Sequence, residues 1–199
     1  MSKNKSESNI LNHDVGRWTL DVGPEKRPAV FLDRDGTIID ELGYLGDPDK
    51  VVLYPGVHDA LMLLKEAGYL LLIVTNQSGI ARGYFSLEDS VAVNLKLLQI
   101  LSDLGVALDG FYFCPHLPDD GCPCRKPAPG MVQKAETDFN INLSNSWIIG
   151  DTDKDVLLGY EAGIRPLLVK TGKQDKGTVP LGVPAMADLR EAARHIMET

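Results

Sequence analysis

The sequence lacks any long apolar run, and its N-terminus lacks the features of an export signal. No stretch approaches the roughly 20 apolar residues that a membrane-spanning helix needs, so we expect no membrane association. Residues 1–8 are polar and mixed in charge, without the apolar segment of a secretion signal. These absences predict a cytoplasmic protein.

Basic residues are also scarce. The chain has 20 Lys and Arg against 28 Asp and Glu, a formal net charge of -8. Nucleic-acid backbones select basic surfaces, so we expect no nucleic-acid partner, and a phosphatase acting on DNA 3′ ends is disfavoured. A small phosphorylated substrate remains compatible with this charge, because it needs only a few local cations and backbone amides.

The remaining pattern is that of one domain in which short apolar runs alternate with helical stretches, and we expect it to be a monomer. Residues 1–26 form a polar, weakly patterned arm, and residues 27–199 form the domain. The predicted strands are 29–32, 70–74, 111–113, 147–149 and 166–169. The predicted helices are 57–67, 87–104, 153–162 and 187–197. The sequence therefore predicts an α/β fold with a doubly wound, Rossmann-like parallel sheet.

Two of these helices have apolar residues at helical spacing, which predicts the face that each one buries. In the first helix this face carries Val57, Leu61 and Leu64. In the helix over 87–104 it carries Val91, Leu95, Leu98 and Leu101.

Two carboxylates follow the first predicted strand. The apolar run 29–32 leads directly into Asp33, Arg34 and Asp35. Ligand sites of open parallel sheets lie beyond the carboxyl ends of the strands. Two acids one residue apart repel each other unless a cation lies between them, and oxygen ligands favour Mg²⁺. A solvated turn with incidental acids is the simpler alternative.

Three further segments have related features. The strand at 147–149 leads through Gly150 to Asp151, with Asp155 four residues later, although acids here could merely favour a helix N-terminus. The strand at 70–74 leads into Thr75, Asn76, Gln77 and Ser78, which suit a phosphate-binding loop or an ordinary turn. A basic pair, Arg125 and Lys126, precedes a proline. The three strand ends and the basic pair, in this order along the chain, indicate a catalytic site far more specifically than any one of these segments alone.

All three cysteines lie within eleven residues. Cys114, His116, Cys122 and Cys124 provide three sulfurs and one imidazole nitrogen, a complete tetrahedral ligand set for Zn²⁺. A closed set with no open position predicts a structural zinc site. Free thiols, or one strained disulfide with a spare cysteine, are the alternatives.

These motifs, over roughly residues 27–172, resemble the haloacid-dehalogenase superfamily of phosphohydrolases. The resemblance implies an enzyme in which Asp33 is the nucleophile that forms an aspartyl-phosphate and Asp35 is the general acid and base. It implies that Thr75 and Lys126 stabilise the transferring phosphoryl group. It also implies that Mg²⁺ is held by Asp151, the Asp33 carboxylate and the Asp35 backbone carbonyl.

The zinc loop and the absence of a segment long enough for a cap narrow the resemblance to two phosphatase families. One acts on D-glycero-D-manno-heptose 1,7-bisphosphate and the other on histidinol phosphate. The long motifs 76–83 and 125–131 favour the heptose family, whereas the short zinc loop favours the histidinol one.

The implied substrate-binding residues are Asn76, Gln77, Ser78 and Arg125. Arg125 is the candidate for a remote second phosphate, ahead of Arg82. Thr152 stands where several heptose phosphatases have a lysine. A phosphate-binding protein without turnover is the alternative from another class.

Overall fold

A computed structural model describes residues 26–172 and 182–199, so the predicted arm lies outside the described residues except for Lys26. Six parallel strands form one sheet in the order β3-β2-β1-β4-β5-β6. Their bounds are β1 Ala29–Leu32, β2 Leu70–Asn76, β3 Gly110–Cys114, β4 Trp147–Gly150, β5 Arg165–Val169 and β6 Ala185–Met186. The predicted doubly wound α/β fold is confirmed.

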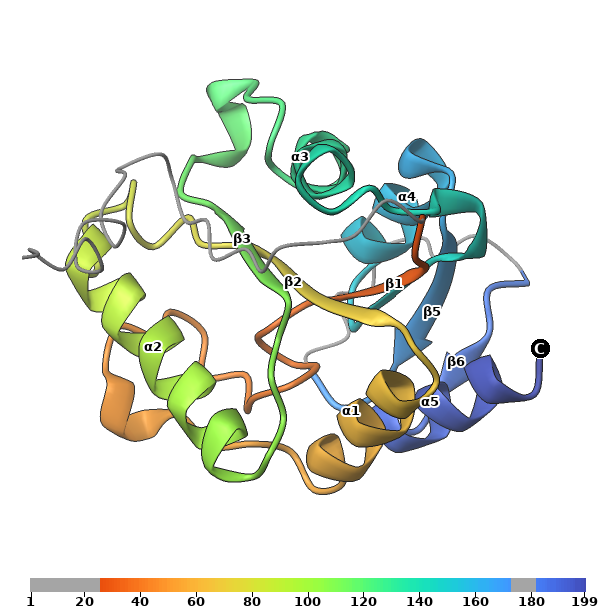
Figure 1. Ribbon diagram of the computed structural model, residues 1–199. Coiled ribbons are helices and arrows are strands. Elements are labelled where there is room, and N and C mark those ends of the chain that lie inside the picture. The colour runs from red at the N-terminus through yellow and green to blue at the C-terminus, as the bar shows by residue number, and fades with distance from the viewer. Residues whose placement is uncertain (1–25, 173–181) are drawn as a thin grey trace, which may run out of the picture.

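Helices cover both faces of this sheet (Figure 1). Their bounds are α1 Val57–Glu66, α2 Leu87–Asp103, α3 Gly130–Phe139, α4 Asp153–Ala162 and α5 Leu189–Met197. Alternate residues of β1 face opposite layers, because Val30 and Leu32 pack with α1, α2 and α5 while Phe31 packs with α3 and α4. Strands covered on both faces have to be apolar throughout, as these are.

The prediction differed from the structure in three elements. It missed β6, a two-residue edge strand, and α3, whose buried residues Met131, Ala135 and Phe139 are spaced by four. It was also wrong about the buried face of α2. Val91 and Leu95 are exposed, and the helix instead buries Ser90, Val93, Asn94, Leu97 and Leu101.

The chain order defines where a ligand site belongs. β1 is followed in sequence by β2 on one side, and β4 pairs with it on the other, so the connections diverge at the carboxyl end of β1. Such a switch point leaves a crevice between the loops. Two of the described segments that border it are 33–56, with the 3-10 helix η1 (Pro48–Lys50), and 115–129, with η2 (Pro118–Asp120). Neither contains a folded cap.

No helix of the described chain has the length and apolar character needed to span a bilayer.

Candidate active site

A cavity of about 170 Å³ opens at this switch point. Its walls contain every residue predicted to be catalytic, substrate-binding or a magnesium ligand. These are Asp33, Asp35, Thr75, Asn76, Gln77, Ser78, Arg125, Lys126 and Asp151. The convergence has a simple cause, since parallel strands β1, β2 and β4 end at the same edge of the sheet. The structure therefore brings all nine residues together.

Three buried carboxylates, those of Asp33, Asp151 and Asp155, have an oxygen each within 4.8 Å of one another. Burial is the main cause that raises the pKa of Asp33 to about 6 and that of Asp151 to about 8. One Asp151 oxygen, Oδ1, is buried without a hydrogen-bond partner among the described residues. An orphaned buried oxygen in a cluster of acids fits a hard divalent cation.

Two glycines make room for the Asp151 carboxylate. A Cβ on Gly36 would lie 2.5 Å from Asp151 Oδ2, and one on Gly172 would overlap the same atom. Gly36 also has a positive φ of 85°, which glycine adopts without strain. The backbone thus closes on the Asp151 carboxylate from two sides.

Lys126 joins two of these acids. Its Nζ lies 2.8 Å from Asp33 Oδ1 and 2.6 Å from Asp155 Oδ1. Burial by itself lowers the pKa of the Lys126 amine, but attraction to Asp155 and Asp33 outweighs burial and holds that pKa above its usual range. Lys126 is therefore a permanent cation beside Asp33. The other Asp155 oxygen accepts from the Thr152 backbone N–H at 3.1 Å and hydroxyl at 2.7 Å.

The Asp35 carboxylate is held from two directions. Arg34, which the sequence motif gave no role, donates from Nε to Asp35 Oδ2 at 3.1 Å and from NH2 to Oδ1 at 3.0 Å. Gln77 Nε2 donates to Asp35 Oδ2 at 2.8 Å and to Thr75 Oγ1 at 3.0 Å. The Gln77 amide therefore orients two predicted catalytic groups, while its predicted contact with substrate stays a prediction.

Asn76 holds the segment that carries Lys126. Its Nδ2 donates to the Lys126 carbonyl at 3.1 Å, and its Oδ1 accepts from the Lys126 N–H at 3.0 Å. This pair of hydrogen bonds connects the end of β2 to the backbone of Lys126. The peptide bond between Lys126 and Pro127 is cis. The Asn76 side chain thus places the cation.

An aromatic rim borders the cavity. Tyr44 lines it, and the Tyr84 ring lies edge-on to Tyr44 at 4.7 Å between centroids. Both rings are more than half exposed, at 52% and 61%. Behind them Phe85 packs where a Cβ on Gly79 would clash. The segment after β1 that carries Tyr44 and the segment after β2 that carries Gly79, Tyr84 and Phe85 therefore meet at this rim.

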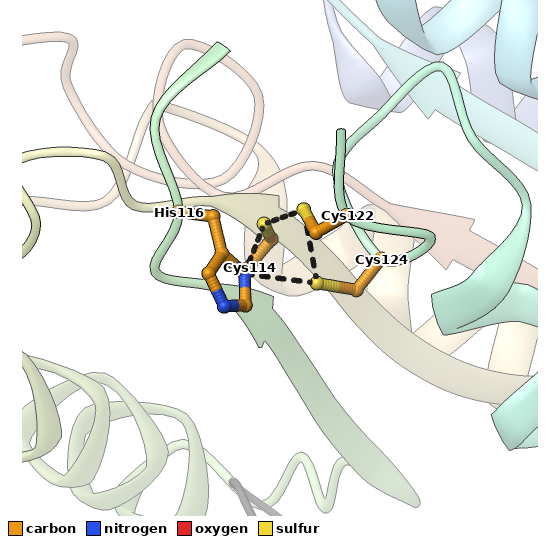
Figure 2. A group of neighbouring side chains, drawn as sticks. All are labelled: Cys114, His116, Cys122 and Cys124. Carbon is orange, nitrogen blue, oxygen red and sulfur yellow. Dashed lines mark hydrogen bonds between the residues drawn. The ribbon is translucent and has the colours of Figure 1, made fainter. Parts of the chain in front are cut away.

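The four predicted zinc ligands form a compact group (Figure 2). The Cys114 and Cys124 sulfurs each lie 3.5 Å from that of Cys122, and His116 Nδ1 lies 3.5 Å from Cys114 Sγ and 3.3 Å from Cys124 Sγ. Sulfurs around a tetrahedral zinc lie roughly 3.8 Å apart, so the spacing fits that geometry. All three cysteines are free, which excludes the disulfide alternative in this structure.

The cysteine cluster is continuous with the cavity. Cys114 ends β3, and its carbonyl accepts the Gln77 N–H at 2.7 Å. Arg125, which follows Cys124, donates from NH1 to the His116 carbonyl at 3.1 Å. The cluster therefore supports both the loop after β2 and the Arg125–Lys126 segment.

A parallel α/β sheet with paired acids after β1, a hydroxyl after β2, a buried lysine and an acid after β4 defines a haloacid-dehalogenase-like hydrolase. A family profile described as HAD-hydrolase-like matches residues 123–193. The chain is 41% identical over 179 residues to D-glycero-beta-D-manno-heptose-1,7-bisphosphate 7-phosphatase of Yersinia pestis, covering 84% of this chain and 95% of the relative. It is 45% identical over 155 residues to the same enzyme of Haemophilus ducreyi, covering 74% and 85%.

Solved structures agree. The D,D-heptose 1,7-bisphosphate phosphatase of B. bronchiseptica, complexed with magnesium and phosphate, superimposes with a TM-score of 0.79 at 34% identity, covering 86% of this chain and 98% of that one. The corresponding enzyme of Burkholderia thailandensis gives 0.67 at 31% identity, covering 87% and 100%. The chain belongs to the heptose 1,7-bisphosphate 7-phosphatase family of haloacid-dehalogenase-like hydrolases.

Proposed function

We propose that the protein is a Mg²⁺-dependent phosphatase that removes the 7-phosphate of D-glycero-D-manno-heptose 1,7-bisphosphate through an aspartyl-phosphate on Asp33. The observation that carries this proposal is the meeting of Asp33, Asp35, Thr75 and Lys126 in one cavity with Asp151. The names of the relatives support the substrate and favour it over histidinol phosphate. The four catalytic side chains argue against a binding protein without turnover.

In this mechanism an Asp33 oxygen attacks phosphorus, and the bond to the C7 oxygen breaks. Asp35 gives its proton to that oxygen, and in the second step takes one from the water that hydrolyses the aspartyl-phosphate. Thr75 and Lys126 contact the phosphoryl oxygens as charge shifts onto them. Lys126 already touches Asp33, so it is positioned at the reacting carboxylate.

The Asp33 and Asp151 carboxylates, with the Asp35 carbonyl, would hold Mg²⁺, whose charge offsets repulsion between Asp33 and an anionic phosphate. Cys114, His116, Cys122 and Cys124 would hold a structural Zn²⁺. Asn76, Gln77, Ser78 and Arg125 form the wall against which the rest of the substrate lies.

The test compares wild type with Asp33→Asn, and uses Asp103→Asn on the exposed end of α2 as the control. The amide is nearly isosteric but is a poor nucleophile, so phosphate release should fall by roughly 1,000-fold or more. Near-normal release from folded Asp33→Asn would refute the mechanism. A wild-type preference for histidinol phosphate over the heptose bisphosphate would refute the substrate assignment alone.

A further inference from the structure

Arg34 is a fully buried cation inside the catalytic motif, with 0% of its side chain exposed. A buried charge is costly unless it is paired and hydrogen-bonded. In Arg34 every nitrogen of the guanidinium has a hydrogen-bond partner. Two nitrogens of the guanidinium contact the Asp35 carboxylate, and the third, NH1, donates to Asn94 Oδ1 at 2.6 Å.

Asn94 lies on α2, far from the motif in sequence, and only 5% of it is exposed. It occupies the buried face of the helix, where an apolar residue is the norm. Its bond to Arg34 connects the helix to the loop after β1. The polar residue at this position therefore has a specific partner in the active site.

The contacts also distinguish the two Asp35 oxygens. Oδ2 accepts from Arg34 Nε and from Gln77 Nε2 and also lies 2.8 Å from Arg34 NH2, whereas Oδ1 accepts only from Arg34 NH2, at 3.0 Å, among the described residues. A carboxylate oxygen has two lone pairs, so Oδ2 is fully used and Oδ1 keeps one lone pair available. The planar guanidinium fixes the plane of the carboxylate in which that lone pair lies.

From this network we infer that Arg34 and Asn94 are a positioning pair that aims Asp35 Oδ1 at the leaving-group oxygen. The inference rests on the proposed function, in which Asp35 gives a proton to that oxygen and later takes one from water. Neither Arg34 nor Asn94 lines the cavity, so they act through Asp35 and not on the substrate.

The test truncates Asn94, because removing Arg34 would leave Asp35 and Asn94 unpaired in the interior. Asn94→Ala is compared with Ser90→Ala, one turn earlier on the same buried face. The Ser90 hydroxyl has no hydrogen-bond partner among the described residues. Each variant is assayed on the heptose bisphosphate and on p-nitrophenyl phosphate, whose leaving phenolate hardly needs a proton.

With the heptose bisphosphate, Asn94→Ala should lower kcat by about 10- to 100-fold and change KM by less than about threefold, as expected for misaligned proton transfer. With p-nitrophenyl phosphate, rapid mixing of Asn94→Ala should show a first-turnover burst of p-nitrophenol at the wild-type rate, because its leaving group needs no proton from Asp35. Later turnovers should be slow, because hydrolysis of the aspartyl-phosphate still needs Asp35. Ser90→Ala should behave as wild type with both.

Asp35→Asn separates failure of this inference from failure of the proposed function. Like Asn94→Ala, it should slow the heptose bisphosphate and preserve the p-nitrophenyl phosphate burst, and its loss of kcat should be larger. If Asp35→Asn shows no such dependence on the leaving group, the assigned role of Asp35 is wrong. If Asp35→Asn shows it while folded Asn94→Ala loses nothing, or slows the first-turnover burst of p-nitrophenyl phosphate as much as the first turnover of the heptose bisphosphate, the positioning pair alone is refuted.

Discussion

At the scale of single residues, contacts decide roles that the residue type leaves open. The spacing of acids and cations after the strands predicts which residues meet, because strand ends of a parallel sheet must converge. It does not predict what an amide will bind. Asn76 and Gln77 both follow β2, yet one holds the Lys126 backbone and the other holds Asp35 and Thr75.

The first prediction at this scale separates Arg125 from Lys126. Arg125 lines the cavity beside the cysteine cluster and can bind a remote phosphate with two charged hydrogen bonds. Arg125→Ala should lower kcat/KM for the heptose bisphosphate by roughly 10- to 100-fold. It should hardly affect a heptose monophosphate that carries only the 7-phosphate.

Lys126→Ala serves as the comparison, because Lys126 contacts Asp33 and should act on any substrate. Steady-state kinetics with both substrates provide the measurement. Equal losses with Arg125→Ala on the two substrates would contradict recognition of the second phosphate.

The second prediction concerns pH and Mg²⁺. The pKa values of about 6 for Asp33 and about 8 for Asp151 lie above the ordinary 3.8, so the metal-free folded state holds protons that the unfolded state has lost. Its stability should therefore rise as pH falls from about 8 towards 4, where the unfolded carboxyls also become protonated. Mg²⁺ must displace these protons, so its affinity should fall as pH falls from about 8 to 6.

Thermal melts with and without Mg²⁺ measure this effect. The increase in Tm caused by Mg²⁺ should be larger near pH 8 than near pH 6, and Asp151→Asn should lose most of it at both. An increase that is independent of pH in the wild-type protein would show that neither acid binds the ion.

At the scale of elements, hydrophobic pattern predicts a strand or helix well where its buried face is purely apolar. β1 was predicted with its observed bounds, and the buried face of α1 contains the predicted Val57, Leu61 and Leu64. The pattern fails for α2, whose buried face includes Ser90 and Asn94. Asn94 is buried because it bonds to Arg34, and a contact between distant segments leaves no periodic signal in the sequence.

The third prediction tests the loop contact that forms the rim. A Cβ on Gly79 would lie within about 2.5 Å of the Phe85 ring and 3.0 Å from Tyr44 Cδ1. Gly79→Ala should therefore push the two loops apart, raising KM for the heptose bisphosphate by roughly 10-fold while kcat changes little.

Phe85→Ala removes the clashing ring, so the double variant Gly79→Ala/Phe85→Ala supplies the control. The double variant should recover part of the loss caused by Gly79→Ala, and this non-additivity is expected for residues in contact. Strictly additive effects on KM would contradict a direct packing role.

At the scale of the whole molecule, the cysteine cluster and the active site form one continuous structure. Cys114 ends the strand beside β2, Cys124 precedes Arg125, and Gly130 at the start of α3 donates its N–H to the Pro123 carbonyl at 2.9 Å. The loop 115–129 has few apolar contacts apart from those of its cysteines. Its conformation therefore depends on the cysteine cluster and on the polar contacts of Lys126 more than on the apolar core.

The last prediction follows from that arrangement. The protein purified without chelator should contain one Zn²⁺ per chain, and a zinc-selective chelator used with excess Mg²⁺ should remove it. Structural zinc is worth on the order of 10 kcal/mol in isolated finger peptides, but here it would organise only one loop beside a large core. Burial raises the pKa of the Cys114 thiol, so without a cation this cysteine stays protonated and holds its neighbours weakly.

Chelation should therefore raise KM for the heptose bisphosphate before the sheet unfolds, and added zinc should restore it. Far-ultraviolet circular dichroism monitors the fold while kinetics monitor the site. Cys122→Ser should reproduce the effect of chelation, since it removes one ligand without touching the cavity. Because Arg125 follows the cluster directly, hydrolysis of the bisphosphate should suffer more than that of the monophosphate. Absence of zinc, or unfolding that coincides with the loss of activity, would contradict a local role for the metal.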